Sequence, residues 1–340
     1  MTKDKILRVG VTRDFVRTDG TVNFLPEAWH RLEGHPRIEL HLLEDEAPTT
    51  LTRAHTSAFD VILMKRSPLP ASAIGEPAPR LFLVSRNGVG FDHIDVPACT
   101  EAGIMVTITP DAVRRPVASA IMALILSLAH QVIPRDQMTR AGRWKERWNT
   151  PGIALTGRTL GVVGLGNIGR ELLRVAAPWD MRLIGVEPFV PQEGFPDLDV
   201  ELVDLDTVLA EADFVSLCCP YIPATHHLIG ARELALMKPS AYLVNTARGE
   251  IIDEPALVQA LSVGGIAGAG IDVFEKEPPA TDNPLFGLDN VVLGSHNLAF
   301  NDESNDLGNI GAAEAILAVA NGESPRHLIN PEVLEHPRFK

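Results

Sequence analysis

The 340-residue sequence contains few cysteines and no long apolar run. Cys99, Cys218 and Cys219 provide neither a disulfide framework nor a C-x-x-C pair, which favours reduced thiols. The longest apolar run, 121–129, is shorter than a bilayer requires, and the N-terminal residues lack a signal-peptide cleavage pattern. We therefore expect a cytoplasmic protein with no membrane partner.

Positive charge is also scarce, because 30 Lys and Arg residues face 44 Asp and Glu residues and leave a formal net charge of -14. Such a chain repels phosphate backbones at long range, which argues against a nucleic-acid partner. Apolar residues make up 45% of the chain and charged residues 22%, as in ordinary globular proteins. The length corresponds to about two domains.

Two series of short apolar runs alternate with helical patterns, which predicts βαβ units and parallel sheets. The first series comprises 6–12, 38–43, 61–64, 81–85 and 104–107. The second series predicts six strands, at 159–164, 182–186, 214–218, 242–245, 267–272 and 291–295. Between the two series lie a long apolar helix, expected at 117–132, and a polar linker or interface arm at about 140–150.

After the last run, a helical pattern at 310–320 needs a partner. The commonest arrangement returns such a tail to the first domain, with hinges near 109–110 and 300–301. We therefore expect one domain of residues 1–110 plus 301–340 and a second of residues 111–300.

The second domain begins with a glycine-rich loop. Gly164, Gly166 and Gly169 form a G-x-G-x-x-G motif between an apolar strand pattern and a helical pattern, where the loop and the helix N-terminus can bind a pyrophosphate. Glu187 follows the next strand, where a carboxylate can accept hydrogen bonds from a ribose. No Arg or Lys lies between Glu187 and Asp197 to neutralise a 2′-phosphate, which favours NAD over NADP.

The later strands end in residues that can handle a small acid. Arg248, Asp272 and His296 follow three strands in turn, and Glu277 lies just beyond Asp272. Arginine can hold a carboxylate through two hydrogen bonds, and histidine exchanges a proton near neutral pH. A carboxylate beside the histidine favours its protonated form. Singly, an Arg at a strand end is usually a surface cation and a lone His is more often a structural residue. Together, at one rim of one sheet, these residues provide an anion clamp, a carboxylate and an imidazole.

The adjacent His226 and His227 suggest a metal site, which we discount. Adjacent residues on a helix or strand point in different directions, and no Cys or carboxylate lies at zinc-ligand spacing from them. We expect instead that this loop borders the cofactor.

These motifs, in this order and at these separations, closely resemble the NAD-dependent D-isomer-specific 2-hydroxyacid dehydrogenases. The matching segments are 164–169, 245–249, 272–278 and His296, together with a substrate-loop pattern at 88–95, so the resemblance covers nearly the whole chain. It implies two Rossmann-like domains, a flavodoxin-like substrate domain and a doubly wound NAD-binding domain, with the active site in the cleft between them. It also implies a homodimer, in which an arm at about 117–150 crosses the interface.

The resemblance assigns a role to individual residues. It implies Arg248 as substrate clamp, His296 as acid/base and Glu277 as its partner, with the backbone N–H groups of Val89 and Gly90 on the substrate carboxylate. The implied NAD-binding residues are Gly164, Gly166, Asn167, Ile168, Gly169, Glu187, Pro220, Thr225, Thr246, Ala247 and Asp272.

Alternatives remain open at this point. Co-repressor scaffolds of the same fold also bind NAD(H) with little turnover, although this chain lacks a low-complexity tail for recruiting partners. Phosphite dehydrogenases carry Lys where this chain has Val89, which disfavours phosphite. The sequence does not determine which acid is used, the direction of the reaction, or whether the pairs Arg114–Arg115 and Lys65–Arg66 touch substrate.

Overall fold

The computed structural model describes residues 5–17, 19–44, 50–75 and 79–340. The chain divides into two compact units, unit 1 with Met1–Val113 and Asn301–Lys340, and unit 2 with Arg114–Phe300. Each unit is an α/β domain around one parallel sheet, as the alternating pattern predicts.

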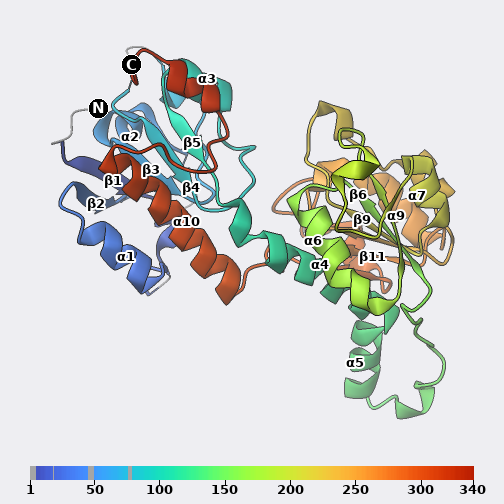
Figure 1. The fold of residues 1–340 in the computed structure, drawn as a ribbon. Helices are drawn as coiled ribbons and strands as arrows, with labels where there is room; N and C mark the ends of the chain where they lie inside the picture. The colour runs from blue at the N-terminus through green and yellow to red at the C-terminus, as the bar shows by residue number, and fades with distance from the viewer. Residues whose placement is uncertain (1–4, 18, 45–49, 76–78) are drawn as a thin grey trace. The chain divides into compact units, whose positions relative to one another are not determined.

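Unit 1 contains a five-stranded parallel sheet (Figure 1). Its strand order is β2-β1-β3-β4-β5, the flavodoxin-like order that the resemblance implies. The strands are β1 (Leu7–Val11), β2 (Ile38–Leu42), β3 (Val61–Met64), β4 (Leu83–Arg86) and β5 (Met105–Thr107). The helices are α1 (Pro26–Glu33), α2 (Arg53–Ala58), α3 (Val96–Glu101) and α10 (Asp302–Asn321).

The C-terminal helix α10 packs on unit 1. It contacts α1 and β4, and the Ser85 hydroxyl at the end of β4 donates a hydrogen bond to the Ala312 carbonyl at 2.9 Å. The side-chain amide of Asn87 donates to Asn309 Oδ1 at 2.7 Å. The last helix of the chain thus covers the sheet that the first strands build.

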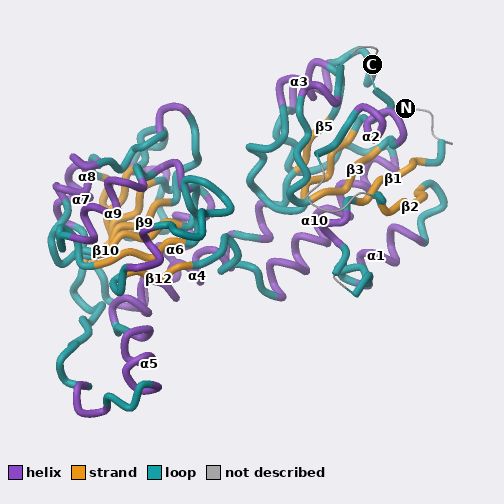
Figure 2. Tube along the Cα trace, turned by 180° about the vertical axis from the view of Figure 1, so that it is seen from behind, coloured by secondary structure: helices purple, strands orange, loops and turns teal. Residues whose placement is uncertain are grey.

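Unit 2 contains a seven-stranded parallel sheet in the order β12-β11-β10-β9-β6-β7-β8 (Figure 2). Its strands are β6 (Thr159–Val163), β7 (Arg182–Val186), β8 (Glu201–Leu202), β9 (Phe214–Leu217), β10 (Tyr242–Asn245), β11 (Gly268–Ile271) and β12 (Val291–Leu293). Its helices are α4 (Arg114–Ala129), α5 (Val132–Arg140), α6 (Asn167–Ala176), α7 (Leu205–Glu211), α8 (Ala231–Leu236) and α9 (Glu254–Ser262). This is the doubly wound topology, with its switch point between β6 and β9.

The prediction of six strands in unit 2 is wrong, because β8 was missed. This edge strand has only two residues, exposed Glu201 and half-buried Leu202, so no apolar run marks it. Its pairing with β7 is a tertiary contact.

Successive side chains along the strands of unit 2 point to opposite faces of the sheet, and helices cover both faces. Leu160 and Val162 of β6 pack into one cluster with apolar residues of α4 and α6. Val163 joins the opposite cluster with residues of α7, α8 and α9. Both faces are buried, as expected for a parallel sheet with helices on either side.

The long apolar helix expected at 117–132 corresponds to α4, which begins at Arg114 and ends at Ala129. The backbone of Gln131 is in the left-handed region at φ 53°, which ends α4 before α5 begins. Among the described residues, the segment Pro110–Ala129 alone is long and apolar enough to span a membrane. The apolar run 121–129 therefore underestimated the length of apolar helix in this region. Within the segment Pro110–Ala129, 56% of the apolar 18-residue window is buried, and α4 packs against α6 and strands β10–β12, as a core helix does.

In unit 1, Asp60 is a fully buried carboxylate that joins several segments. Its oxygens accept hydrogen bonds from the Arg8 amide at 2.9 Å, from Arg80 Nη2 at 2.7 Å and from Lys5 Nζ. Burial by itself raises the pKa of Asp60, but the hydrogen bonds from Arg80, Lys5 and the Arg8 amide outweigh it and hold the pKa below its ordinary value.

Replacing Asp60 with Asn removes the charge and leaves Lys5 and Arg80 without their counter-ion. We expect Asp60→Asn to lower the unfolding free energy of unit 1 at pH 7 by about 3 kcal/mol. Because the folded-state pKa is depressed, this stabilisation is present above the unfolded pKa of about 4 and disappears as the pH falls through the folded value. The difference between wild type and variant must therefore shrink in acid.

The measurement is urea unfolding at neutral and acidic pH, monitored through the exchange of backbone amides in β1 and β3. Asp136→Asn is the matched control, because Asp136 pairs with Arg140 on the surface of α5, where such pairs contribute little. Equal losses in both variants would contradict the structural role of Asp60.

Candidate active site

The turn after β10 carries Arg248 and is built on buried Asn245. The Asn245 Nδ2 group donates to the Arg248 carbonyl at 2.8 Å, and its Oδ1 accepts from the Ala247 amide at 3.0 Å. The Arg248 guanidinium also donates to the Ala247 carbonyl at 2.7 Å. Asn245 therefore positions the Thr246–Ala247–Arg248 turn. Sequence reasoning placed it in a motif without assigning this role.

The structure brings the side chains of His296 and Glu277 into contact. Nδ1 of His296, after β12, lies 2.7 Å from Glu277 Oε2, and both side chains are 37% exposed. Glu277 also accepts the Phe274 amide through Oε1 at 3.2 Å. The backbone of His296 is in the left-handed region at φ 55°, and its amide donates to the Asp272 carbonyl at 2.7 Å. A non-glycine residue in that region costs energy that its surroundings must offset.

Asp272, after β11, is buried behind His296. Its carboxylate accepts hydrogen bonds from the amides of Asn297 at 3.2 Å and Leu298 at 3.4 Å. Burial raises the pKa of Asp272, although these amides oppose the shift. The side chain therefore organises the segment that follows His296.

The loops after β10 and β11 meet backbone to backbone. A Cβ on Gly249, next to Arg248, would lie 1.9 Å from the Phe274 carbonyl carbon and 2.3 Å from the Glu275 nitrogen, so only glycine fits. Parallel pairing of β10, β11 and β12 also ends all three strands at one edge of the sheet. The predicted residues Arg248, Glu277 and His296 lie on the loops at that edge.

The glycine-rich loop connects β6 to α6 as predicted. Gly164 has φ 95°, and a Cβ there would lie 2.6 Å from the Cys219 nitrogen of the loop after β9. A Cβ on Gly169 would lie 2.1 Å from the Gly164 carbonyl oxygen, whereas a Cβ on Gly166 would meet nothing within 4 Å. Asn167 and Ile168 open α6, so their N–H groups belong to the helix N-terminus.

Glu187, after β7, lies against this loop. Its carboxylate accepts the Leu165 amide at 3.1 Å through Oε2 and the Phe189 amide at 3.1 Å through Oε1. Open space over Gly166, a helix N-terminus and an oriented carboxylate are the parts a dinucleotide needs, so the residues of this loop fit such a cofactor.

The loop after β9 is ordered by Thr225, whose hydroxyl donates to the Pro220 carbonyl at 2.8 Å and accepts from the Ile222 amide at 2.8 Å. The expectation that His226 and His227 point in different directions is wrong. Their rings stack with centroids 4.0 Å apart, because this segment is a turn and His227 has φ 49°.

In the part of the chain that the structure describes, no group of three or more His, Cys, Asp or Glu side chains could hold a metal ion. Burial raises the pKa of Cys218 to about 12 and that of Cys219 to about 11, so both thiols stay protonated at neutral pH.

In unit 1, Val89 and Gly90 lie in the loop between β4 and α3. This loop is attached to the segment that follows β5, because the Gly88 amide donates to Thr109 Oγ1 at 2.7 Å and the Thr109 amide donates back to the Gly88 carbonyl at 2.9 Å. In unit 2, Arg115 and Arg114 at the start of α4 pair with Glu171 of α6, at 2.9 Å and 3.7 Å.

Comparison with known proteins identifies the family of this chain. Residues 122–297 match the family model of the D-isomer specific 2-hydroxyacid dehydrogenase NAD-binding domain. A glyoxylate reductase of Korarchaeum cryptofilum is 39% identical over 311 residues, which cover 90% of this chain and 93% of that protein. The chain belongs to the D-isomer specific 2-hydroxyacid dehydrogenase family. It is an NAD-dependent dehydrogenase of 2-hydroxy acids.

Solved dehydrogenases of this family share the fold. The D-lactate dehydrogenase of Aquifex aeolicus, complexed with NAD and lactic acid, is 26% identical with a TM-score of 0.80, over 93% of this chain and 96% of that one. The NADPH-dependent glyoxylate/hydroxypyruvate reductase of Sinorhizobium meliloti, complexed with NADP and malonate, is 27% identical with a TM-score of 0.80, over 96% and 97%.

The glycine geometry separates a structural from a binding role. Gly169→Ala forces a methyl group against the Gly164 carbonyl, so we expect it to lower the melting temperature of the dehydrogenase and to weaken NADH binding. Gly166→Ala meets open space, so we expect an unchanged melting temperature and at least tenfold weaker NADH binding, because a pyrophosphate must approach this backbone closely.

Differential scanning fluorimetry and NADH fluorescence titration measure the two effects. Tight NADH binding by a folded Gly166→Ala variant would show that the pyrophosphate does not approach Gly166.

Proposed function

We propose that this dehydrogenase interconverts a D-2-hydroxy acid and its 2-oxo acid with NAD(H), using His296 and Glu277 for proton transfer and Arg248 to hold the substrate carboxylate. The observation that carries the proposal is the 2.7 Å contact between His296 Nδ1 and Glu277 Oε2, on loops at the same sheet edge as the Arg248 turn.

The His296–Glu277 contact assigns the two ring nitrogens different roles in this proposal. Nδ1 contacts the Glu277 carboxylate, and Nε2 gives a proton to the substrate oxygen during reduction or takes it during oxidation. Glu277 orients the ring, and the Phe274 amide in turn orients Glu277.

Arg248 is the proposed carboxylate clamp. Its backbone is held by Asn245, and its planar guanidinium can bind a 2-oxo acid's carboxylate through parallel hydrogen bonds while increasing the polarisation of the carbonyl group. The family resemblance adds the backbone amides of Val89 and Gly90 in unit 1 as further donors to that carboxylate.

NAD is the proposed cofactor. It supplies or accepts the hydride when bound. The loop Gly164–Gly169 and the first N–H groups of α6 would hold its pyrophosphate, and Glu187 its adenosine ribose. The family resemblance adds Asp272 at the nicotinamide amide, with Pro220, Thr225, Thr246 and Ala247 lining the site. The Glu187 carboxylate and the absence of Arg or Lys before Asp197 support NAD over NADP.

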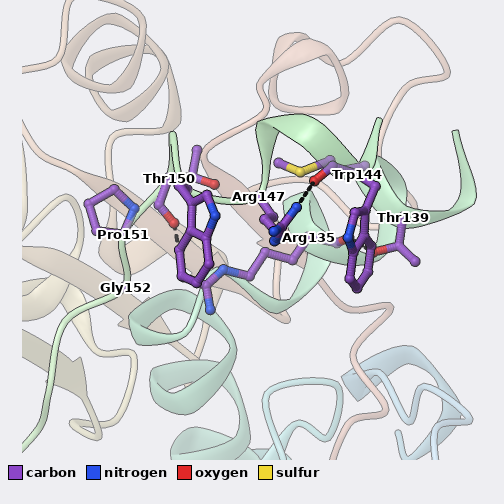
Figure 3. A pocket seen from close by; sticks show the side chains of 9 residues that line it. Arg135, Thr139, Trp144, Arg147, Thr150, Pro151 and Gly152 are labelled. Atoms are coloured by element: carbon purple, nitrogen blue, oxygen red, sulfur yellow. Dashed lines mark hydrogen bonds between the residues drawn. The ribbon is translucent and has the colours of Figure 1, made fainter. Parts of the chain in front are cut away.

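The arm formed by α5 and the segment to Gly152 supports the proposal of a homodimer. Trp144 is 62% exposed and Trp148 79% exposed, with the Arg147 guanidinium 5.3 Å and 5.1 Å from their ring centroids. Arg147 also donates to the Trp144 carbonyl, and Arg135 to the Thr150 carbonyl, around a pocket on the arm (Figure 3). Two exposed tryptophans on one segment are typical of a protein interface.

The rival function is a co-repressor-type scaffold that binds NAD(H) and turns over little. The named relatives described above are dehydrogenases or reductases, which favours the enzyme. Turnover decides between the two, since a scaffold would bind NADH and oxidise it negligibly with any acid.

The proposed activity is tested by NADH oxidation with glyoxylate, hydroxypyruvate, pyruvate, oxaloacetate, 2-ketoisocaproate, phenylpyruvate and ketopantoate, with NADPH in parallel. We expect turnover of at least one acid and a higher kcat/KM with NADH than with NADPH. NADH binding without turnover on the whole panel would favour the scaffold or an acid outside the panel.

On the acid that is turned over, Arg248→Ala should lower kcat/KM by about 10³-fold, because it removes both binding and polarisation of the substrate. His296→Ala should lower kcat by about 10²- to 10⁴-fold and leave the Kd of NADH nearly unchanged. Wild-type kinetics in Arg248→Ala would refute the clamp, and a large loss of NADH binding in His296→Ala would make that residue structural.

The dimer proposal is tested by light scattering after gel filtration. We expect the wild type to have twice the chain mass and the double variant Trp144→Ser/Trp148→Ser to shift toward monomer, because both exposed indoles are removed from the interface. Trp179→Ser is the control, since Trp179 is an exposed tryptophan outside the arm. A monomeric wild type would overturn the proposal.

A further inference from the structure

His227 lies outside the residues assigned above, yet it contacts the loop that carries Glu277. Its Nε2 is 2.9 Å from Glu275 Oε1, and its amide donates to the Glu250 carbonyl at 2.9 Å, two residues beyond Arg248. Because an ionised carboxylate only accepts, His227 Nε2–H is the donor. His227 thus joins three loops of unit 2: its own, the one after β10 and the one after β11.

Glu275 is held from a second side by the N-terminus of α9. Its Oε2 accepts the Glu254 amide at 3.2 Å, and the Glu275 amide donates back to Glu254 Oε2 at 3.1 Å. The remaining Glu254 oxygen, Oε1, accepts Asn283 Nδ2 at 2.7 Å. We call His227, Glu254, Glu275 and Asn283 the Glu275 brace.

The brace ends next to the proposed acid/base pair. Glu275 follows Phe274, whose amide donates to Glu277 Oε1, and Glu277 Oε2 contacts His296. The Phe274–Glu275 backbone also lies against Gly249, beside Arg248. A shift of the turn 274–277 would therefore move Glu277 relative to His296.

Stability alone explains the His227–Glu275 pair poorly. Both side chains are about one-third exposed, and ion pairs at such positions contribute little to stability. His227 adopts φ 49°, a left-handed backbone conformation that costs energy for a non-glycine residue. The cost of the strained His227 backbone offsets the stability that the His227–Glu275 pair contributes. Stability therefore does not account for the arrangement, and the position of the turn 274–277 does.

We propose that His227 and Glu275 are positioning residues for the dehydrogenase: the brace holds the turn 274–277 so that Glu277 keeps its hydrogen bond to His296. This inference rests on the proposed function, in which His296 and Glu277 move the proton.

The brace itself is tested without activity, by hydrogen–deuterium exchange of the wild-type chain and three variants. His227→Ala removes the donor to Glu275, and His227→Gln keeps an N–H donor at a similar reach. His226→Ala is the matched control, because His226 stacks on His227 without a hydrogen bond to Glu275. We expect faster exchange of the Glu254, Phe274 and Glu275 amides in His227→Ala only. Unchanged exchange there overturns the proposal.

Kinetics with the acid that is turned over test the consequence. We expect His227→Ala to lower kcat by about 10- to 100-fold, with KM and the Kd of NADH within twofold, because a misplaced acid/base group affects the chemical step. His227→Gln should recover most of the loss. An unchanged kcat alongside faster amide exchange would mean that the brace does not position Glu277.

A double-mutant cycle separates positioning from general damage. If His227 acts through Glu277, His227→Ala should lower kcat by less than twofold in a Glu277→Gln background, because nothing remains to be positioned. Multiplicative losses would overturn the proposal. A wild type that turns over no acid would refute the proposed function, while the exchange result would still decide whether the brace exists.

Discussion

Parallel pairing of every strand in unit 2 is the constraint on which the site depends. Asn245, Ile271 and Leu293 end adjacent strands at one edge, so the three following loops begin side by side. The reversal of strand order between β6 and β9 separates the loops that lead to either half of the sheet. This pairing brings the loops that carry Arg248, Glu277 and His296 to one edge of the sheet.

Carboxylates then determine the shape of the loops. Asp272 accepts the amides that follow His296, Glu187 accepts those around the glycine-rich loop, and Glu275 and Glu254 exchange amide hydrogen bonds. A chain with a net charge of -14 thus uses several acidic side chains as backbone acceptors. Hydrogen bonds to ionised groups are strong, so each of these residues orders a turn.

Most of the features that could be predicted depend on local sequence patterns. The G-x-G-x-x-G motif predicts its loop, and the apolar runs predict the strands and the residues at their ends, because sterics and burial act over a few residues. Weak local signals caused the errors. Two-residue β8 has no apolar run, the break at Gln131 lies inside an apolar stretch, and the 226–227 turn has no strong turn residue.

The sequence by itself determined the two parallel α/β domains, the family and the identity of the candidate residues, because these follow from periodicity and from motifs at fixed spacing. Only the tertiary structure decided the partners of those residues. The contact between His227 and Glu275 spans 48 positions, and that between Gly249 and Phe274 depends on how two loops pack. No local pattern encodes such contacts, since they arise when separate strands pair and bring their loops together.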